Sequence, residues 1–126
     1  MSAASVMTPE HQIASRALTA ELWISLASLL RSHVAMHSIA RMDVPVRIIS
    51  DSGPALELLG PSGKLSILGP NALGFGAIEF RPEAGEFGDE YSTFSFSADG
   101  MVHLENLAAP MDFETAVELW LRKVQA

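Results

Sequence analysis

One kind of turn occurs three times in the middle of the chain, and this repetition constrains the fold more than any other feature. The three turns are Ser50-Asp51-Ser52-Gly53, Gly60-Pro61-Ser62-Gly63 and Ser97-Ala98-Asp99-Gly100. Asp, Pro and Ser favour the first positions of a type I turn, and glycine suits the position of positive φ that precedes the next strand. Each turn therefore predicts a β-hairpin, and together they predict an antiparallel meander.

Segments of alternating apolar residues surround these turns and predict five to six strands. The alternating segments are 44–49, 56–58, 65–67, 78–81, 93–97 and 101–105. Such alternation gives a sheet with one apolar face and one polar face, which is usual when helices cover one side of an antiparallel sheet. Pro45 lacks a backbone donor, so the first of these strands is expected at a sheet edge or to begin near Pro45.

A long helical pattern precedes the sheet. Thr8-Pro9-Glu10 has the residues of a helix start, and the pattern continues to about Arg41. At about 100° per residue, one apolar face spans an arc of about 160°. The residues on this face are Leu18, Leu22, Trp23, Leu26, Leu29, Leu30, Val34 and Met36. Ile13 and Ala17 lie outside it, so we expect a break near Thr19; the alternative is one helix with a second, small apolar face.

A second helical pattern follows the sheet. Asp112 is a good N-cap after Pro110. Apolar residues then recur at helical spacing at Phe113, Ala116, Val117, Trp120, Leu121 and Val124. The predicted fold is therefore α+β, with a long N-terminal helix and a C-terminal helix packed on one face of the sheet. We expect a single domain over residues 9–126, with residues 1–8 disordered or extended.

Composition limits the functional classes. The chain has 126 residues, with 15 acidic and 8 basic residues and a formal net charge of −7, and its basic residues are scattered. An acidic chain without a basic stripe is a poor partner for nucleic acid or anionic membranes. The absence of cysteine excludes disulfides, thiolate metal sites and cysteine nucleophiles. No segment resembles a signal peptide or a membrane span, and we expect a cytoplasmic protein.

His33 and His37 are the candidate metal ligands. They lie four residues apart, hence on one side of the helix, and could share zinc or another divalent ion. Val34 occupies the position where a metallopeptidase helix has glutamate, so that class is excluded. A third ligand would have to come from a residue such as Glu57, Glu79 or Glu105. The alternative is a structural role, because histidine is favoured near a helix C-terminus and at the margin of an apolar stripe.

A second group of polar residues lies on the last predicted hairpin. Its pairing would place His103 opposite Ser95 and Glu105 near Thr93, on the polar face of the sheet. A serine, a base and an acid resemble a catalytic triad in composition. Hydrolysis would also need an exposed serine on a strained turn and donors for an oxyanion, which a flat strand does not supply. A solvated face or a shallow binding surface is the better interpretation.

Two functional classes follow. The first is a non-enzymatic interaction or adaptor domain that acts as a homodimer, with another protein as a further candidate partner and without an obligatory cofactor. In size, acidity and helix–sheet–helix order the chain is loosely similar to the small acidic chaperones of bacterial secretion systems. Those chaperones carry a helix within the sheet where this chain has only Gly69 to Gly74. The alternative is a small-molecule or metal-binding domain, with or without enzymatic activity, that has a cleft between the first helix and the sheet around Trp23, His33 and His37.

Overall fold

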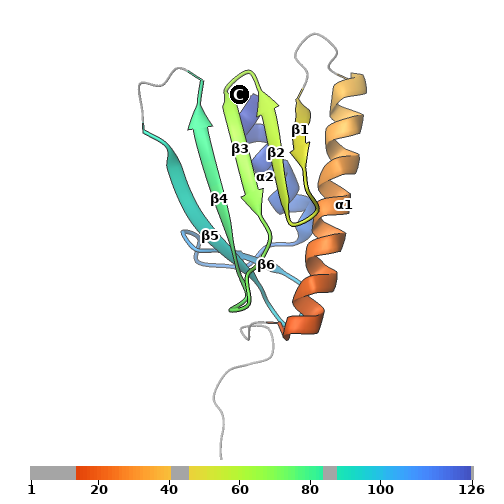
Figure 1. Cartoon of the computed structure of the whole chain (residues 1–126), viewed down its shortest axis with the longest axis vertical. Coiled ribbons are helices and arrows are strands. Elements are labelled where there is room, and N and C mark those ends of the chain that lie inside the picture. The colour runs from red at the N-terminus through yellow and green to blue at the C-terminus, as the bar shows by residue number, and fades with distance from the viewer. Residues whose placement is uncertain (1–13, 41–45, 84–87, 126) are drawn as a thin grey trace, which may run out of the picture.

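The computed structural model describes residues 14–40, 46–83 and 88–125 and has the predicted α+β architecture (Figure 1). Its elements in chain order are α1 (Arg16–Ala40), β1 (Arg47–Asp51), β2 (Ala55–Gly60), β3 (Gly63–Leu68), β4 (Phe75–Pro82), β5 (Glu90–Phe96), β6 (Val102–Leu104) and α2 (Phe113–Gln125). The predicted N-terminal extension, the predicted helix start at Thr8-Pro9-Glu10 and Pro45 lie outside the described residues.

The six strands form one antiparallel sheet in the order β1-β2-β3-β4-β5-β6, so the predicted meander is confirmed. The three predicted turns are confirmed as well, because Gly53, Gly63 and Gly100 have φ values of 92°, 151° and 85°. A residue other than glycine would be strained at these angles, so replacing any of the three glycines would disturb its hairpin. The local turn chemistry thus accounts for three of the five strand pairings, β1–β2, β2–β3 and β5–β6.

The two edges of the sheet are protected in different ways. β1 is an edge strand, as predicted, and α1 packs beside it. Its pairing with β2 shifts between Ile48 and Ser50. At the other edge, the backbone of Val102 in β6 exchanges two hydrogen bonds of 2.8 Å with Met111. Segments outside the sheet therefore cover part of each edge, which limits edge-to-edge pairing between molecules.

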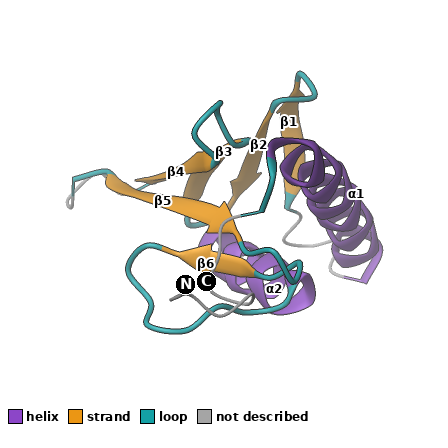
Figure 2. Ribbon diagram, turned by 90° about the horizontal axis from the view of Figure 1, so that it is seen from below, coloured by secondary structure: helices purple, strands orange, loops and turns teal. Residues whose placement is uncertain are grey.

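Both helices lie on the same side of the sheet, as predicted (Figure 2). α1 contacts β1 and α2, and α2 contacts β2 and β3. Phe94 on β5 is only 1% exposed and lies at the centre of the core. Its ring centroid is 6.5 Å from that of Trp23, 5.7 Å from that of Phe96 and 6.0 Å from that of Trp120. These aromatic rings connect both helices to the sheet.

α1 differs from the prediction at two places. The predicted break near Thr19 is wrong, because the helix runs without interruption from Arg16. Ser15 caps this start, with its Oγ accepting a hydrogen bond of 3.2 Å from the backbone N–H of Leu18. The Thr19 hydroxyl is buried without penalty because it donates to the carbonyl oxygen of Ala14 at 3.2 Å.

The second difference concerns the width of the buried stripe. Met36 was predicted on it, but its side chain is 68% exposed. It occupies the margin of the apolar arc, and the described elements leave that margin uncovered near the end of the helix. Leu26 and Leu30, nearer the middle of the arc, and Val34, at its other margin, are buried as predicted.

α2 follows the prediction closely. The Asp112 carboxylate accepts a hydrogen bond of 2.8 Å from the backbone N–H of Thr115, which confirms the N-cap. This bonding lowers the pKa of Asp112. The buried residues of α2 are Ala116, Val117, Trp120, Leu121 and Val124. Neither α1 nor α2 combines the length and the apolar character that a membrane crossing requires.

Candidate functional site

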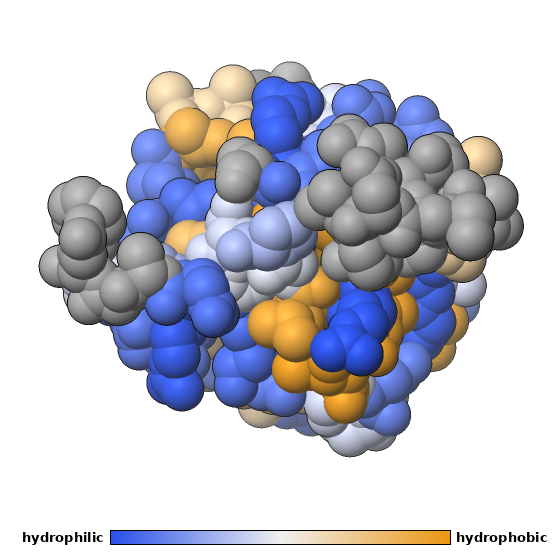
Figure 3. Space-filling model, turned by 90° about the horizontal axis from the view of Figure 1, so that it is seen from above, coloured by the Kyte–Doolittle hydropathy of each residue, from blue (hydrophilic) through white to orange (hydrophobic). Residues whose placement is uncertain are grey.

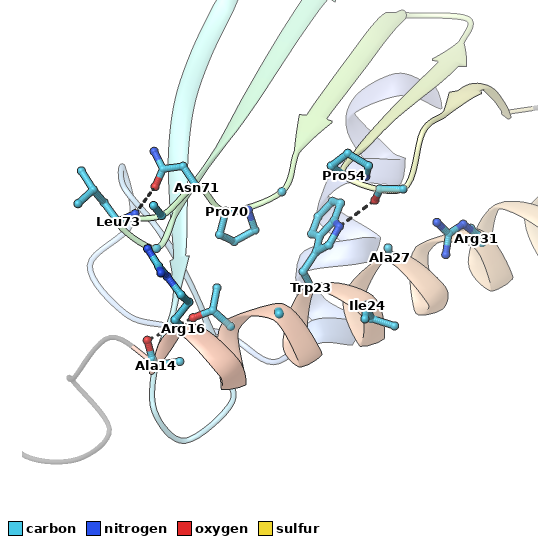
Figure 4. Close-up of a pocket in the computed structure, with 16 residues that line it drawn as sticks. Ala14, Arg16, Trp23, Ile24, Ala27, Arg31, Pro54, Pro70, Asn71 and Leu73 are labelled. Carbon is cyan, nitrogen blue, oxygen red and sulfur yellow. Dashed lines mark hydrogen bonds between the residues drawn. The ribbon is translucent and has the colours of Figure 1, made fainter.

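A pocket of about 660 Å³ opens between the first half of α1 and two loops of the sheet (Figure 4). We call it the α1 groove. Its helical wall is formed by Ala14, Arg16, Thr19, Ala20, Trp23, Ile24, Ala27 and Arg31. Its other wall consists of Gly53 and Pro54 from the β1–β2 turn, together with residues 69–74 that connect β3 to β4. The groove therefore joins segments that are far apart in the sequence.

Trp23 holds the two walls together. Its indole N–H donates a hydrogen bond of 2.9 Å to the carbonyl oxygen of Gly53. The ring also lies against Gly69, where a Cβ atom would come within 2.8 Å of the indole Cε2. Only glycine permits so close an approach at this position. One side chain thus fixes α1 against both loops.

Arg31 and Asp51 form a second connection, at the far end of the groove. Arg31 donates from Nε to Oδ2 of Asp51 at 2.7 Å and from Nη2 to Oδ1 at 3.1 Å. Asp51 Oδ1 also accepts a hydrogen bond of 3.2 Å from the backbone N–H of Gly53. The hydrogen bonds from Arg31 are the main reason that the pKa of Asp51 is lowered. The same ion pair raises the pKa of Arg31.

Internal hydrogen bonds build the loop wall. The side-chain oxygen of Asn71 accepts from the backbone N–H groups of Leu73 at 2.9 Å and Phe75 at 3.1 Å. The Gly69 N–H donates to the carbonyl oxygen of Pro54 at 2.7 Å, and the Gly74 N–H donates to that of Asn71 at 2.9 Å. Most backbone N–H groups of this wall are therefore bonded within the protein.

The chemistry of the groove suits binding better than catalysis. Its walls are mostly apolar or small side chains, and the described lining residues include no carboxylate, imidazole or thiol. Two large apolar side chains stand on opposite rims, Ile24 at 66% exposure and Leu73 at 77%. Apolar walls with a few polar groups are typical of pockets for small ligands.

Of the three predicted ligand-binding residues, Trp23 lines the groove, whereas His33 and His37 do not. His33 is directed towards α2, where its Nε2 lies 3.7 Å from Oε1 of Glu114. His37 Nε2 is buried and makes no hydrogen bond within the described part of the chain. The groove therefore lies along the other half of α1 from the predicted cleft around the two histidines.

The described residues contain no group of three or more potential ligands that could hold a metal ion. Glu57 accepts a hydrogen bond of 3.1 Å from the Ser66 hydroxyl. Glu79 lies 3.7 Å from Arg81, and Glu105 accepts a hydrogen bond of 2.9 Å from the Thr93 hydroxyl. These three carboxylates thus have partners of their own on the sheet. The metal site at His33 and His37 stays a prediction.

The second group of polar residues has the predicted pairing and no catalytic arrangement. Ser95 pairs with His103 in the β5–β6 register, and Thr93 bonds to Glu105. The His103 ring nitrogen Nε2, however, lies 3.2 Å from the carbonyl oxygen of Leu107. Ser95 is buried in its strand. This histidine is therefore turned to the backbone and is not held against a reactive serine.

Arg16, Ala20 and loop 69–74 line the groove and were not among the predicted site residues. Ala20 and Ala27 are seven residues apart, so they share one flank of the helix beside Trp23. Small side chains next to a large aromatic one leave room for a ligand, and this pattern was available in the sequence.

The upper face of the molecule is mainly polar with a few apolar patches (Figure 3). No known protein family, curated protein or solved structure matches this chain.

The Asp51–Arg31 ion pair makes stability depend on pH. The pKa of Asp51 is lower in the folded protein, so its ionised form stabilises the fold above about pH 4, and this contribution disappears as the pH falls through the folded-state pKa. We expect Asp51→Asn to lower the urea midpoint at pH 7, with a difference from wild type that shrinks in acid. Glu118→Gln, an exposed change on α2, is the control. A difference for Asp51→Asn that stayed constant from pH 7 to pH 3 would contradict this role.

Proposed function

We propose that this protein is a non-enzymatic binding module that holds an apolar ligand in the α1 groove. The observation that carries the proposal is the volume of about 660 Å³ with mostly apolar walls, within the range of about 300–1,000 Å³ typical of ligand sites. The proposal corresponds to the alternative class expected from the sequence, a small-molecule-binding domain with a cleft, and it concerns the groove beside Trp23, which neither His33 nor His37 lines. The lack of cysteine agrees with action in the cytoplasm, which is also a proposal.

The rims of the groove support the proposal energetically. Ile24 and Leu73 present apolar surface to water on either side of Trp23. A ligand that covered them would remove this surface from water, which contributes about 25 cal/mol for each Å² buried. The walls are already fixed by the Trp23 and Arg31 hydrogen bonds, so binding would cost little ordering of the protein.

Two alanines on α1 give a matched test. Ala20 and Ala35 are both exposed on the helix, but only Ala20 lines the groove. The probe is N-phenyl-1-naphthylamine, an uncharged dye whose fluorescence rises in apolar surroundings. We expect saturable binding to wild type, a loss of about tenfold or more in affinity for Ala20→Phe because the new ring fills the groove, and a change within about twofold for Ala35→Phe.

Circular dichroism melts of both variants show whether each is folded, and both are expected to be, since the substituted positions face solvent. Dye binding that was unaffected by Ala20→Phe, or equally reduced by the two substitutions, would place the dye elsewhere and refute the proposal. Absence of any dye binding to wild type would refute it too.

A second candidate is self-association as a homodimer. The observation that favours it is the exposure of Ile24 and Leu73, which extend apolar surface beyond the groove. We expect light scattering at tens of micromolar to give a dimer mass that Ile24→Glu converts to a monomer mass. Met36→Glu is the control, because Met36 is equally exposed on α1 but does not line the groove. A monomer mass for wild type would remove this candidate.

A further inference from the structure

Arg16 places a positive charge at one end of the α1 groove. Its side chain extends from the start of α1 towards the loop that carries Asn71 and Leu73 (Figure 4). The groove has one other cation, Arg31, and that guanidinium is bound at two points by Asp51. Among the described residues, no carboxylate lies within ion-pair distance of Arg16. An anionic group bound in the groove would therefore be placed at the Arg16 end.

The loop wall offers few free N–H donors to a peptide backbone. Pro54 and Pro70 have no N–H, and the carbonyl oxygen of Pro54 already accepts from Gly69. The carbonyl oxygen of Gly53 is occupied by the Trp23 indole. An extended peptide carries an N–H and a C=O at every residue, and those left unpaired in an apolar groove would oppose binding. An alkyl chain has no such requirement.

The length of the open part of the groove limits the ligand further. Because Arg31 at the far end is bound by Asp51, the open helical wall runs from Arg16 to Ala27, eleven residues or about 16 Å along the helix axis. An extended saturated chain of roughly a dozen carbons has this length, given carbon–carbon bonds of about 1.5 Å in a zigzag. The small side chains of Ala20 and Ala27 leave the helical wall open to such a chain.

We infer that the α1 groove binds a straight-chain fatty acid of medium length, with its carboxylate at the Arg16 guanidinium and its alkyl chain along Ala20, Trp23 and Ala27. This inference rests on the proposed function, because it names the class of ligand for the same groove. The formal net charge of −7 weakly repels anions, so a preference for the carboxylate has to come from a local cation.

The test compares two ligands that differ at one end. Dodecanoate and dodecan-1-ol, each below its aggregation limit, are titrated against wild type at pH 7.5 by displacement of N-phenyl-1-naphthylamine. We expect wild type to bind dodecanoate about fivefold more tightly than the alcohol, and Arg16→Gln to abolish this preference. Arg47→Gln, an exposed substitution on β1 outside the groove, is expected to keep the preference.

The outcomes separate this inference from the proposed function. Equal affinity of wild type for the two ligands, or a preference that survives Arg16→Gln, overturns the fatty-acid assignment while dye binding sensitive to Ala20→Phe still supports the groove. A leucine-rich hexapeptide with a free C-terminal carboxylate is a third ligand, and tighter binding of it than of dodecanoate also overturns the assignment. If neither the dye nor the alcohol binds, the proposed function fails as well.

Discussion

The contact of Trp23 with Gly53 and Gly69 is the interaction on which the rest of the structure depends. The indole donates to the carbonyl oxygen of Gly53 and packs on the backbone of Gly69, so one side chain ties α1 to two turns of the sheet. Its ring also lies 6.5 Å from that of Phe94 in the core, measured between ring centroids. The position of α1 beside the sheet edge and the aromatic centre of the core are therefore linked through this residue.

The same contact creates the groove. Because Trp23 holds the loops against the helix, the small side chains of Ala20 and Ala27 next to it are left facing open space and not a packed surface. Asp51 neutralises the charge of Arg31 at one end of the groove. Arg16 is the cation at the other end. A stable, apolar and asymmetrically charged groove follows from a few side chains of contrasting size, and this arrangement supports a role in binding an amphipathic ligand.

The fold could be predicted from the sequence because its determinants are local. Turn glycines such as Gly53 and Gly100 fixed the hairpins, and Asp112 marked the start of α2. The expected break near Thr19 was misplaced, because α1 begins at Arg16 with Ser15 as its cap and continues through Thr19. The helical wall of the groove was available in the pattern of Ala20, Trp23 and Ala27, but its loop wall was out of reach because that wall requires Gly69 to meet Trp23, 46 residues away in sequence. The helical wheel placed His33 near the apolar face, but it could not show that Glu114 lies beside it.

The most direct test of the account is a ¹H–¹⁵N NMR titration of the ¹⁵N-labelled protein with dodecan-1-ol, which reports ligand contact residue by residue. If the α1 groove is the binding site, the indole N–H signal of Trp23 and the amide signals of Gly53, Ala72 and Leu73 shift together and saturate. The indole signal of Trp120, which is buried in the core, serves as the internal reference and stays in place. Shifts concentrated on the outer face of β2–β5, or saturation without any change at Trp23, would contradict the account.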